Sequence, residues 1–104
     1  MSESEWQACN DPGLMLEEVE QTISRKQLVE FVRRCWDRIT PYLPTVRSER
    51  TVVDEFAVLA GQQSDHDAAL YAYEASLKAA RWAPDVQAEQ KHQAALLRAI
   101  VSRG

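Results

Sequence analysis

The stretch SRKQLVEFVRRCWDRI, residues 24–39, decides the fold class of this chain. Its apolar residues recur at spacings of three and four, which is the repeat of one face of an α-helix. They are Leu28, Phe31, Val32, Cys35, Trp36 and Ile39. Ser24 with Gln27 three residues later forms a capping box that marks a helix start, and Pro41 and Pro44 mark its end. The stretch therefore predicts a long amphipathic helix with one buried face.

Similar start signals recur on both sides of this helix. They are Ser2 with Glu5, Asp11 before Pro12, Ser48, Ser64 with Asp67, and Asp85 after Pro84. We expect the apolar face after Asp11 to consist of Leu14, Met15, Leu16 and Val19. We expect the helix after Ser64 to bury Leu70, Tyr73, Leu77 and Ala80, while its many alanines allow a neighbouring helix to come close.

Alternation of period two and hairpin dipeptides such as Asn-Gly are absent from the sequence, so no strand pattern competes with the helices. We predict an all-α fold, a compact bundle of five to six helices packed orthogonally or irregularly. With 104 residues, the chain has the length of a single helical domain spanning 1–104.

Composition predicts a cytoplasmic protein. No apolar run is long enough to cross a bilayer, and residues 1–5 are acidic where a signal peptide would be basic and then apolar. Two cysteines, Cys9 and Cys35, are too few for a disulfide scaffold, so we expect them to be reduced thiols.

The net charge of −4 is distributed in alternating segments. Residues 1–23 hold six acids and no Lys or Arg, and residues 51–75 hold five acids and no Lys or Arg. Residues 24–50 and 76–104 carry net charges of +4 and +3. We expect antiparallel helices in which acidic segments lie beside basic ones. The alternative is an anion patch for nucleic acid, made of Arg33, Arg34, Arg38, Arg47 and Arg50, but the acidic total argues against it.

The residue types that carry chemistry do not form a recognisable catalytic pattern. Cys9, Cys35, His66 and His92 lack the short spacings of zinc ligands. Cys35 lies in an apolar stripe, where a thiol acts as a small hydrophobe. His66, between two aspartates, suggests a solvated imidazole with raised proton affinity, and His92 suggests a surface residue. We therefore predict no enzyme, and no catalytic, cofactor-binding or metal-binding residue.

Several of these residues together resemble a family of uncharacterised helical proteins abundant in planctomycete bacteria. The similar positions are Glu5-Trp6, Cys9, Asp11-Pro12, Met15-Leu16, Ser24, Leu28, Phe31, Cys35, Arg38-Ile39, Leu43, Arg47-Ser48, Arg50, Val52, Gly61, Ala88-Glu89, Gln93-Ala94, Leu96-Leu97-Arg98 and Ile100. The likeness covers almost the whole chain. It departs at Arg33, Arg34 and Trp36, where relatives have more cysteines, and relatives often continue into a further tail. The family has no established activity, so the resemblance implies a helical fold and no catalytic residue.

Three functions follow from these patterns as hypotheses. The first is a protein-interaction module that binds a partner helix or a second copy through a wide apolar arc, Leu96, Leu97, Ile100 and Val101. The arc could instead pack inward against Trp6. The second is a small-ligand pocket lined by Trp36, Tyr42, Tyr73 and Trp82. The third is anion binding through the arginines, with nucleic acid an improbable partner.

Overall fold

The helices begin at the capping residues that the sequence predicts. The structure, a computed structural model, describes residues 1–42, 54–58 and 61–101. Its elements are α1 (Glu3–Ala8), α2 (Pro12–Val19), α3 (Arg25–Ile39), the 3-10 turn η1 (Thr40–Tyr42), α5 (Asp65–Ala80) and α6 (Val86–Ile100). Ser2 and Ser24 close complete capping boxes, and the side chains of Asp11, Ser64 and Asp85 accept bonds from backbone N–H groups. The predicted start at Ser48 lies outside the described residues, while 54–58 are helical.

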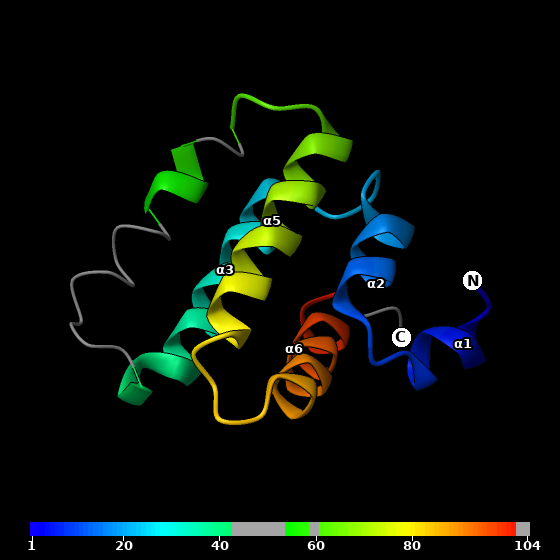
Figure 1. Ribbon diagram of the computed structural model, residues 1–104. Helices are drawn as coiled ribbons and strands as arrows, with labels where there is room; N and C mark the ends of the chain where they lie inside the picture. Colours follow the sequence, from blue (N-terminus) through cyan, green and yellow to red (C-terminus); the bar gives the residue numbers. More distant parts are fainter. Residues whose placement is uncertain (43–53, 59–60, 102–104) are drawn as a thin grey trace.

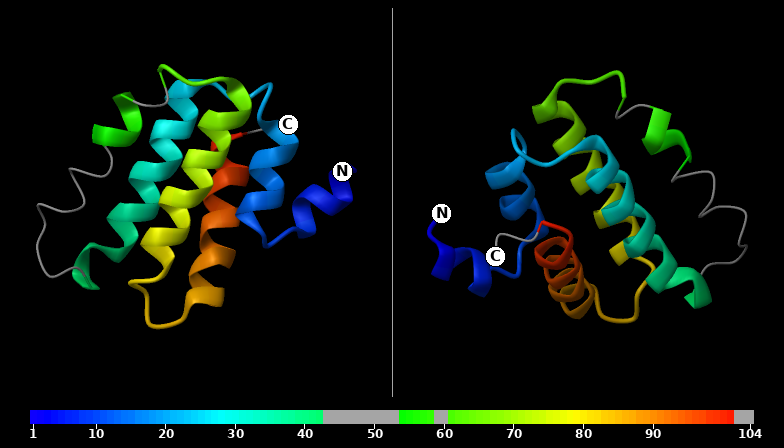
Figure 2. Two further views of the ribbon diagram at one scale, coloured as in Figure 1. Left: turned by 45° about the horizontal axis from the view of Figure 1, so that its top comes forward. Right: turned by 180° about the vertical axis from the view of Figure 1, so that it is seen from behind.

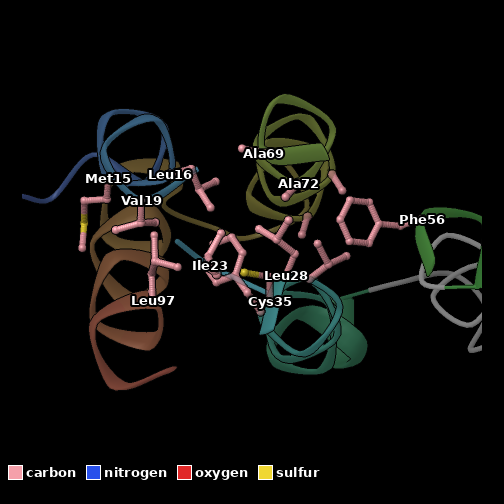
Figure 3. Packing of buried hydrophobic residues seen from close by; sticks show 14 of the residues in the cluster. Met15, Leu16, Val19, Ile23, Leu28, Cys35, Phe56, Ala69, Ala72 and Leu97 are labelled. Atoms are coloured by element: carbon pink, nitrogen blue, oxygen red, sulfur yellow. The ribbon is translucent and has the colours of Figure 1, made fainter. Parts of the chain in front are cut away.

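Helices α2, α3, α5 and α6 pack around one apolar core, to which Trp6 of α1 and Phe56 also contribute (Figures 1 and 3). Helix α5 lies between α3 and α2, and α6 packs against all three. The short α1 lies beyond α2 at the edge of the molecule, as both views of Figure 2 show. The described part of the chain contains no strand, and α6 is inclined to the α3–α5 pair. The predicted all-α fold with irregular packing is confirmed.

Helices α3 and α5 run parallel. Arg25 and Asp65, the first residues of the two helices, form an ion pair of 2.7 Å. Further along, the indole N–H of Trp36 donates to the carbonyl oxygen of Ala75 at 3.1 Å. Since both residue numbers rise together, the helices point the same way. The predicted neighbourhood of a basic and an acidic helix is correct here, but the antiparallel direction is wrong.

Helix α6 closes the bundle antiparallel to α3. Arg38 near the end of α3 pairs with Glu89 near the start of α6. Gln27 near the start of α3 donates to the carbonyl oxygen of Ile100 at the end of α6, at 3.2 Å. These two contacts join α3 to α6 at both ends of their interface.

The buried face of α3 is the predicted one, whereas α5 buries a different face from the one expected. All six residues of the α3 stripe are buried. On α5, Leu70 is 45% exposed, and Tyr73 and Leu77 are only half-buried. Ala80 is buried as predicted, and the other buried residues of α5 are also small: Ala68, Ala69, Ala72, Ala75, Ser76 and Ala79. Small side chains let the two helix backbones approach closely enough for the indole of Trp36 to reach a carbonyl of α5.

Helix α2 shows a similar difference. Met15, Leu16 and Val19 are buried as predicted, but Leu14 is 53% exposed. Among the described residues, no helix combines the length and apolar character needed to cross a membrane.

Candidate functional site

The apolar arc of α6 belongs mostly to the core. Leu97 is completely buried, and Leu96, Ile100 and Val101 are partly buried against the core. Figure 3 shows Leu97 pointing into the same interior as Val19 of α2. The prediction that Leu97 belongs to a partner surface is therefore wrong, and for this residue the alternative of inward packing is correct.

The end of α6 is also fixed to the first helix. Arg98 of α6 donates through Nη1 to the carbonyl oxygen of Cys9, the C-cap of α1, at 2.6 Å. Trp6 of α1 is buried in the same cluster as Leu97. The last turn of α6 therefore has little apolar surface left for a partner.

The described arginines of the predicted anion patch each pair with a carboxylate, although two of them share one. Arg33 and Arg34 both pair with Glu30, at 3.7 and 2.8 Å. Arg38 binds Glu89 through two hydrogen bonds of 2.9 and 3.2 Å. Arg47 and Arg50 lie outside the described residues.

The Arg38–Glu89 pair is asymmetric in burial. The Glu89 side chain is 8% exposed, while that of Arg38 is 39% exposed. Hydrogen bonding to Glu89 raises the pKa of Arg38 above its ordinary value. A carboxylate this enclosed needs its cation, because the interior cannot solvate a lone charge.

The candidate metal ligands lie in different surroundings. Cys35 is fully buried, and this burial raises the pKa of its thiol. Cys9 is partly exposed, and its thiol lies 3.6 Å from the carbonyl oxygen of Asp11. His66 and His92 are exposed. Across the ranges that the structure describes, no three side chains of His, Cys, Asp or Glu are placed to share a metal ion.

The four aromatic residues predicted to line a pocket are not gathered in one place. Trp36 is enclosed between α3 and α5, whereas Tyr42 and Trp82 are 51% and 46% exposed. Of the four, only Tyr73 lines the groove that the structure contains between α2 and α5.

This α2–α5 groove has a volume of about 310 Å³ and a mostly apolar lining. Its apolar lining comes from Gly13 and Leu14 on α2 and from Ala69, Leu70 and Tyr73 on α5. A Cβ atom on Gly13 would lie 2.8 Å from Cε1 of Tyr73, so the aromatic ring packs directly on the backbone of α2. Glycine at this position therefore sets the depth of the groove at one end.

The rim of the groove is acidic. Asp11, Glu17 and Glu20 line it, together with His66, and no Lys or Arg is among its lining residues. Nδ1 of His66 lies 2.9 Å from Oε2 of Glu20, and this hydrogen bond raises the pKa of the imidazole. The predicted solvated imidazole with raised proton affinity is confirmed; the main cause is Glu20, the C-cap of α2, and the neighbouring Asp67 contributes less.

The three carboxylates are engaged to different degrees. Asp11 accepts from the N–H of Gly13 at 2.9 Å as the cap of α2, and Glu20 is bound to His66. Glu17 is exposed and forms no ion pair with a residue that the structure describes. Its charge is the one most available to a partner.

Sequence reasoning missed this groove. Leu14 and Leu70 were both expected to point inward, and neither carries a local signal that it lies at the surface. The available signal was the acidity of segments 1–23 and 51–75, because two acidic segments that lie together produce an acidic surface.

No family model, curated protein or solved structure matches the chain, so the resemblance to the planctomycete family stays a prediction.

Proposed function

We propose that this chain is a non-enzymatic protein-interaction module whose docking surface is the α2–α5 groove. The observation that carries the proposal is the exposure of Leu14 on α2 and Leu70 on α5, at 53% and 45%, where both line one groove. The partly buried residue Tyr73 lines the same groove. Apolar side chains that converge on a groove with a polar rim are typical of binding surfaces.

The non-enzymatic part of the proposal rests on how the ionisable side chains are engaged. Arg38 is bound to Glu89, and the thiol of Cys35 is enclosed in the core. A general base or nucleophile must reach a substrate, and these groups are directed at other side chains or at the interior.

The size of the groove predicts a modest affinity. Fully burying a leucine stabilises by roughly 1.5–3 kcal/mol, so covering the exposed halves of Leu14 and Leu70 contributes about 1 kcal/mol each. With a similar gain from Tyr73, the apolar contacts supply about 3 kcal/mol, which is less than the roughly 8 kcal/mol of a micromolar complex. Polar contacts at the rim must therefore add to the binding of any tight partner.

Affinity purification with matched baits tests the proposal. Leu70→Asp places a charge in the groove and should abolish recovery of the proteins that wild type captures from cells that produce it natively. Tyr42→Asp changes an equally exposed apolar residue outside the groove and should leave recovery unchanged. Recovery of the same proteins with Leu70→Asp would exclude the groove as the docking surface. Circular dichroism must first show that both variants are folded.

Self-association is one form of the same proposal. Two-fold dimers are the commonest homo-oligomers, and a second copy could cover Leu14 and Leu70. Sedimentation at micromolar concentration should then show a dimer that Leu70→Asp converts to a monomer. Leu97→Asp is unsuitable as a probe because it would place a charge in the core.

A small-ligand site is the second candidate function. The groove volume of about 310 Å³ falls at the lower end of ligand pockets, which span roughly 300–1,000 Å³, and the ring of Tyr73 offers an aromatic surface. A ligand of this kind should raise the melting temperature of wild type and have no effect on Leu70→Asp. Equal stabilisation of both proteins would place the ligand elsewhere.

A further inference from the structure

We infer that the α2–α5 groove takes a cationic amphipathic helix of a partner protein, about two turns of which contact the groove. This inference rests on the proposed function and specifies the chemistry of the partner. Three features of the groove carry it: its length, the nature of its walls and the position of its charges.

The length follows from the contacts at the two ends. His66 meets Glu20 at one end, and Tyr73 lies against Gly13 at the other. Glu20 follows Gly13 by seven positions, which at the 1.5 Å rise of an α-helix is about 10 Å. The groove therefore accommodates about two helical turns of a partner.

The walls determine the backbone conformation of the partner. Both walls are α-helices, whose backbone N–H and C=O groups are bonded within the helix, so the groove has no strand edge to which a peptide backbone could bind. A partner that loses water there must satisfy its own backbone groups. An α-helix does so, and its i, i+3 and i+4 side chains would meet Leu14, Tyr73 and Leu70.

The charges beside the groove determine the sign of the charge that a partner helix must carry. Glu17 follows Leu14 by three residues, and Glu74 follows Leu70 by four, so each exposed leucine has an exposed acid one turn further on the same face of its helix. No ion pair joins Glu17 or Glu74 to a residue within the described ranges. Lys or Arg beside the apolar residues of a partner helix would complement this leucine–glutamate pattern, and an acidic helix would be repelled.

Three synthetic peptides test the inference with the full-length protein labelled with ¹⁵N. The first is a peptide of about 15 residues, long enough to form a helix, with Leu at spacings of three and four and Lys elsewhere. The second has Glu in place of every Lys. The third has the composition of the first in an order that gives no apolar face. The amide signals of Gly13, Leu14 and Leu70 report binding in the groove.

We expect the Lys peptide to shift these amide signals, with an affinity that falls about tenfold or more between 0.05 and 0.5 M salt. The Glu peptide and the reordered peptide should bind at least about tenfold more weakly. Equal binding of the Glu peptide would overturn the assignment of charge and leave the groove as a docking surface. Equal binding of the reordered peptide would overturn the helix. Failure of every peptide to shift the groove signals would overturn both this inference and the groove as the docking surface for a helix.

A pair of double variants separates the effect of Glu17, which lines the groove, and of Glu74, which lies one turn beyond Leu70, from the effect of the net charge of the protein. Glu17→Gln with Glu74→Gln should weaken binding of the Lys peptide about tenfold and reduce its dependence on salt. Asp54→Asn with Glu55→Gln removes two exposed charges from the segment 54–58, which does not line the groove. Equal weakening by the two double variants would show a long-range effect of net charge and overturn the inference.

Discussion

The two residues of the Arg38–Glu89 pair differ in burial, so we predict that substituting one of them lowers the free energy of unfolding more than substituting the other. In Arg38→Met, both hydrogen bonds to Glu89 disappear and a carboxylate with 8% of its side chain exposed stays in the α3–α6 interface. Leaving a charge buried without its partner costs about 3 kcal/mol. In Glu89→Gln, the guanidinium that remains is 39% exposed and can be hydrated, so the cost falls to about 1 kcal/mol.

Urea unfolding followed by circular dichroism and tryptophan fluorescence measures both costs. For a chain of this length, 1 kcal/mol corresponds to about 4–8 °C in melting temperature, so in thermal unfolding Arg38→Met should lower the melting temperature by about 15 °C. Arg34→Met is the matched control, because Arg34 lies on the same helix and its partner Glu30 is 37% exposed. We expect this control to cost under about 0.5 kcal/mol. Equal costs for Arg38→Met and Glu89→Gln, or for Arg38→Met and the control, would refute the reasoning.

Three further predictions concern the thiols, the imidazole and the helix interface. Because burial raises the pKa of its thiol, Cys35 should resist iodoacetamide in the native protein, while the partly exposed Cys9 should be alkylated. Mass spectrometry detects the alkylated residue, and rapid labelling of Cys35 in the native protein would contradict its buried position. Because Glu20 raises the pKa of His66, the stabilisation by this pair should be complete below the ordinary pKa of 6.5 and be lost as pH rises through the raised value. The urea midpoint of wild type should therefore fall relative to that of His66→Gln between about pH 6 and pH 8, and parallel curves would exclude the pair as a source of stability. Ala72→Leu should cost about 1–3 kcal/mol in urea unfolding because Ala72 is fully buried on the face of α5 that meets α3, and an unchanged midpoint would show that the interface has room.

The helix starts and the core of α3 could be predicted from sequence because local interactions determine them. A cap such as Ser24 bonds to the backbone three residues away, whatever the rest of the chain does. The stripe from Leu28 to Ile39 has only one apolar face to bury, so its orientation is not ambiguous.

The buried face of α5 could not be predicted in the same way. Leucine and tyrosine recur at spacings of three and four on one face of this helix, and alanine does so on another. Which face turns inward depends on how close α3 comes, and that distance depends on contacts such as Trp36 with Ala75, 39 residues apart. The groove was missed for the same reason, since Leu14 and Leu70 become neighbours only after α5 turns its alanines inward.

The parallel pairing of α3 and α5 also has a consequence for the order of folding. The contact between Trp36 and Ala75 closes a loop of 39 residues, whereas Gln93 reaches Ser76 across only 17 residues and joins α5 to α6. Loop-closure entropy favours the shorter loop by about 0.7 kcal/mol, so the α5–α6 hairpin should nucleate first and α3 should dock onto it afterwards. Substitutions at Gln93 should then slow refolding, while substitutions at Trp36 should chiefly accelerate unfolding.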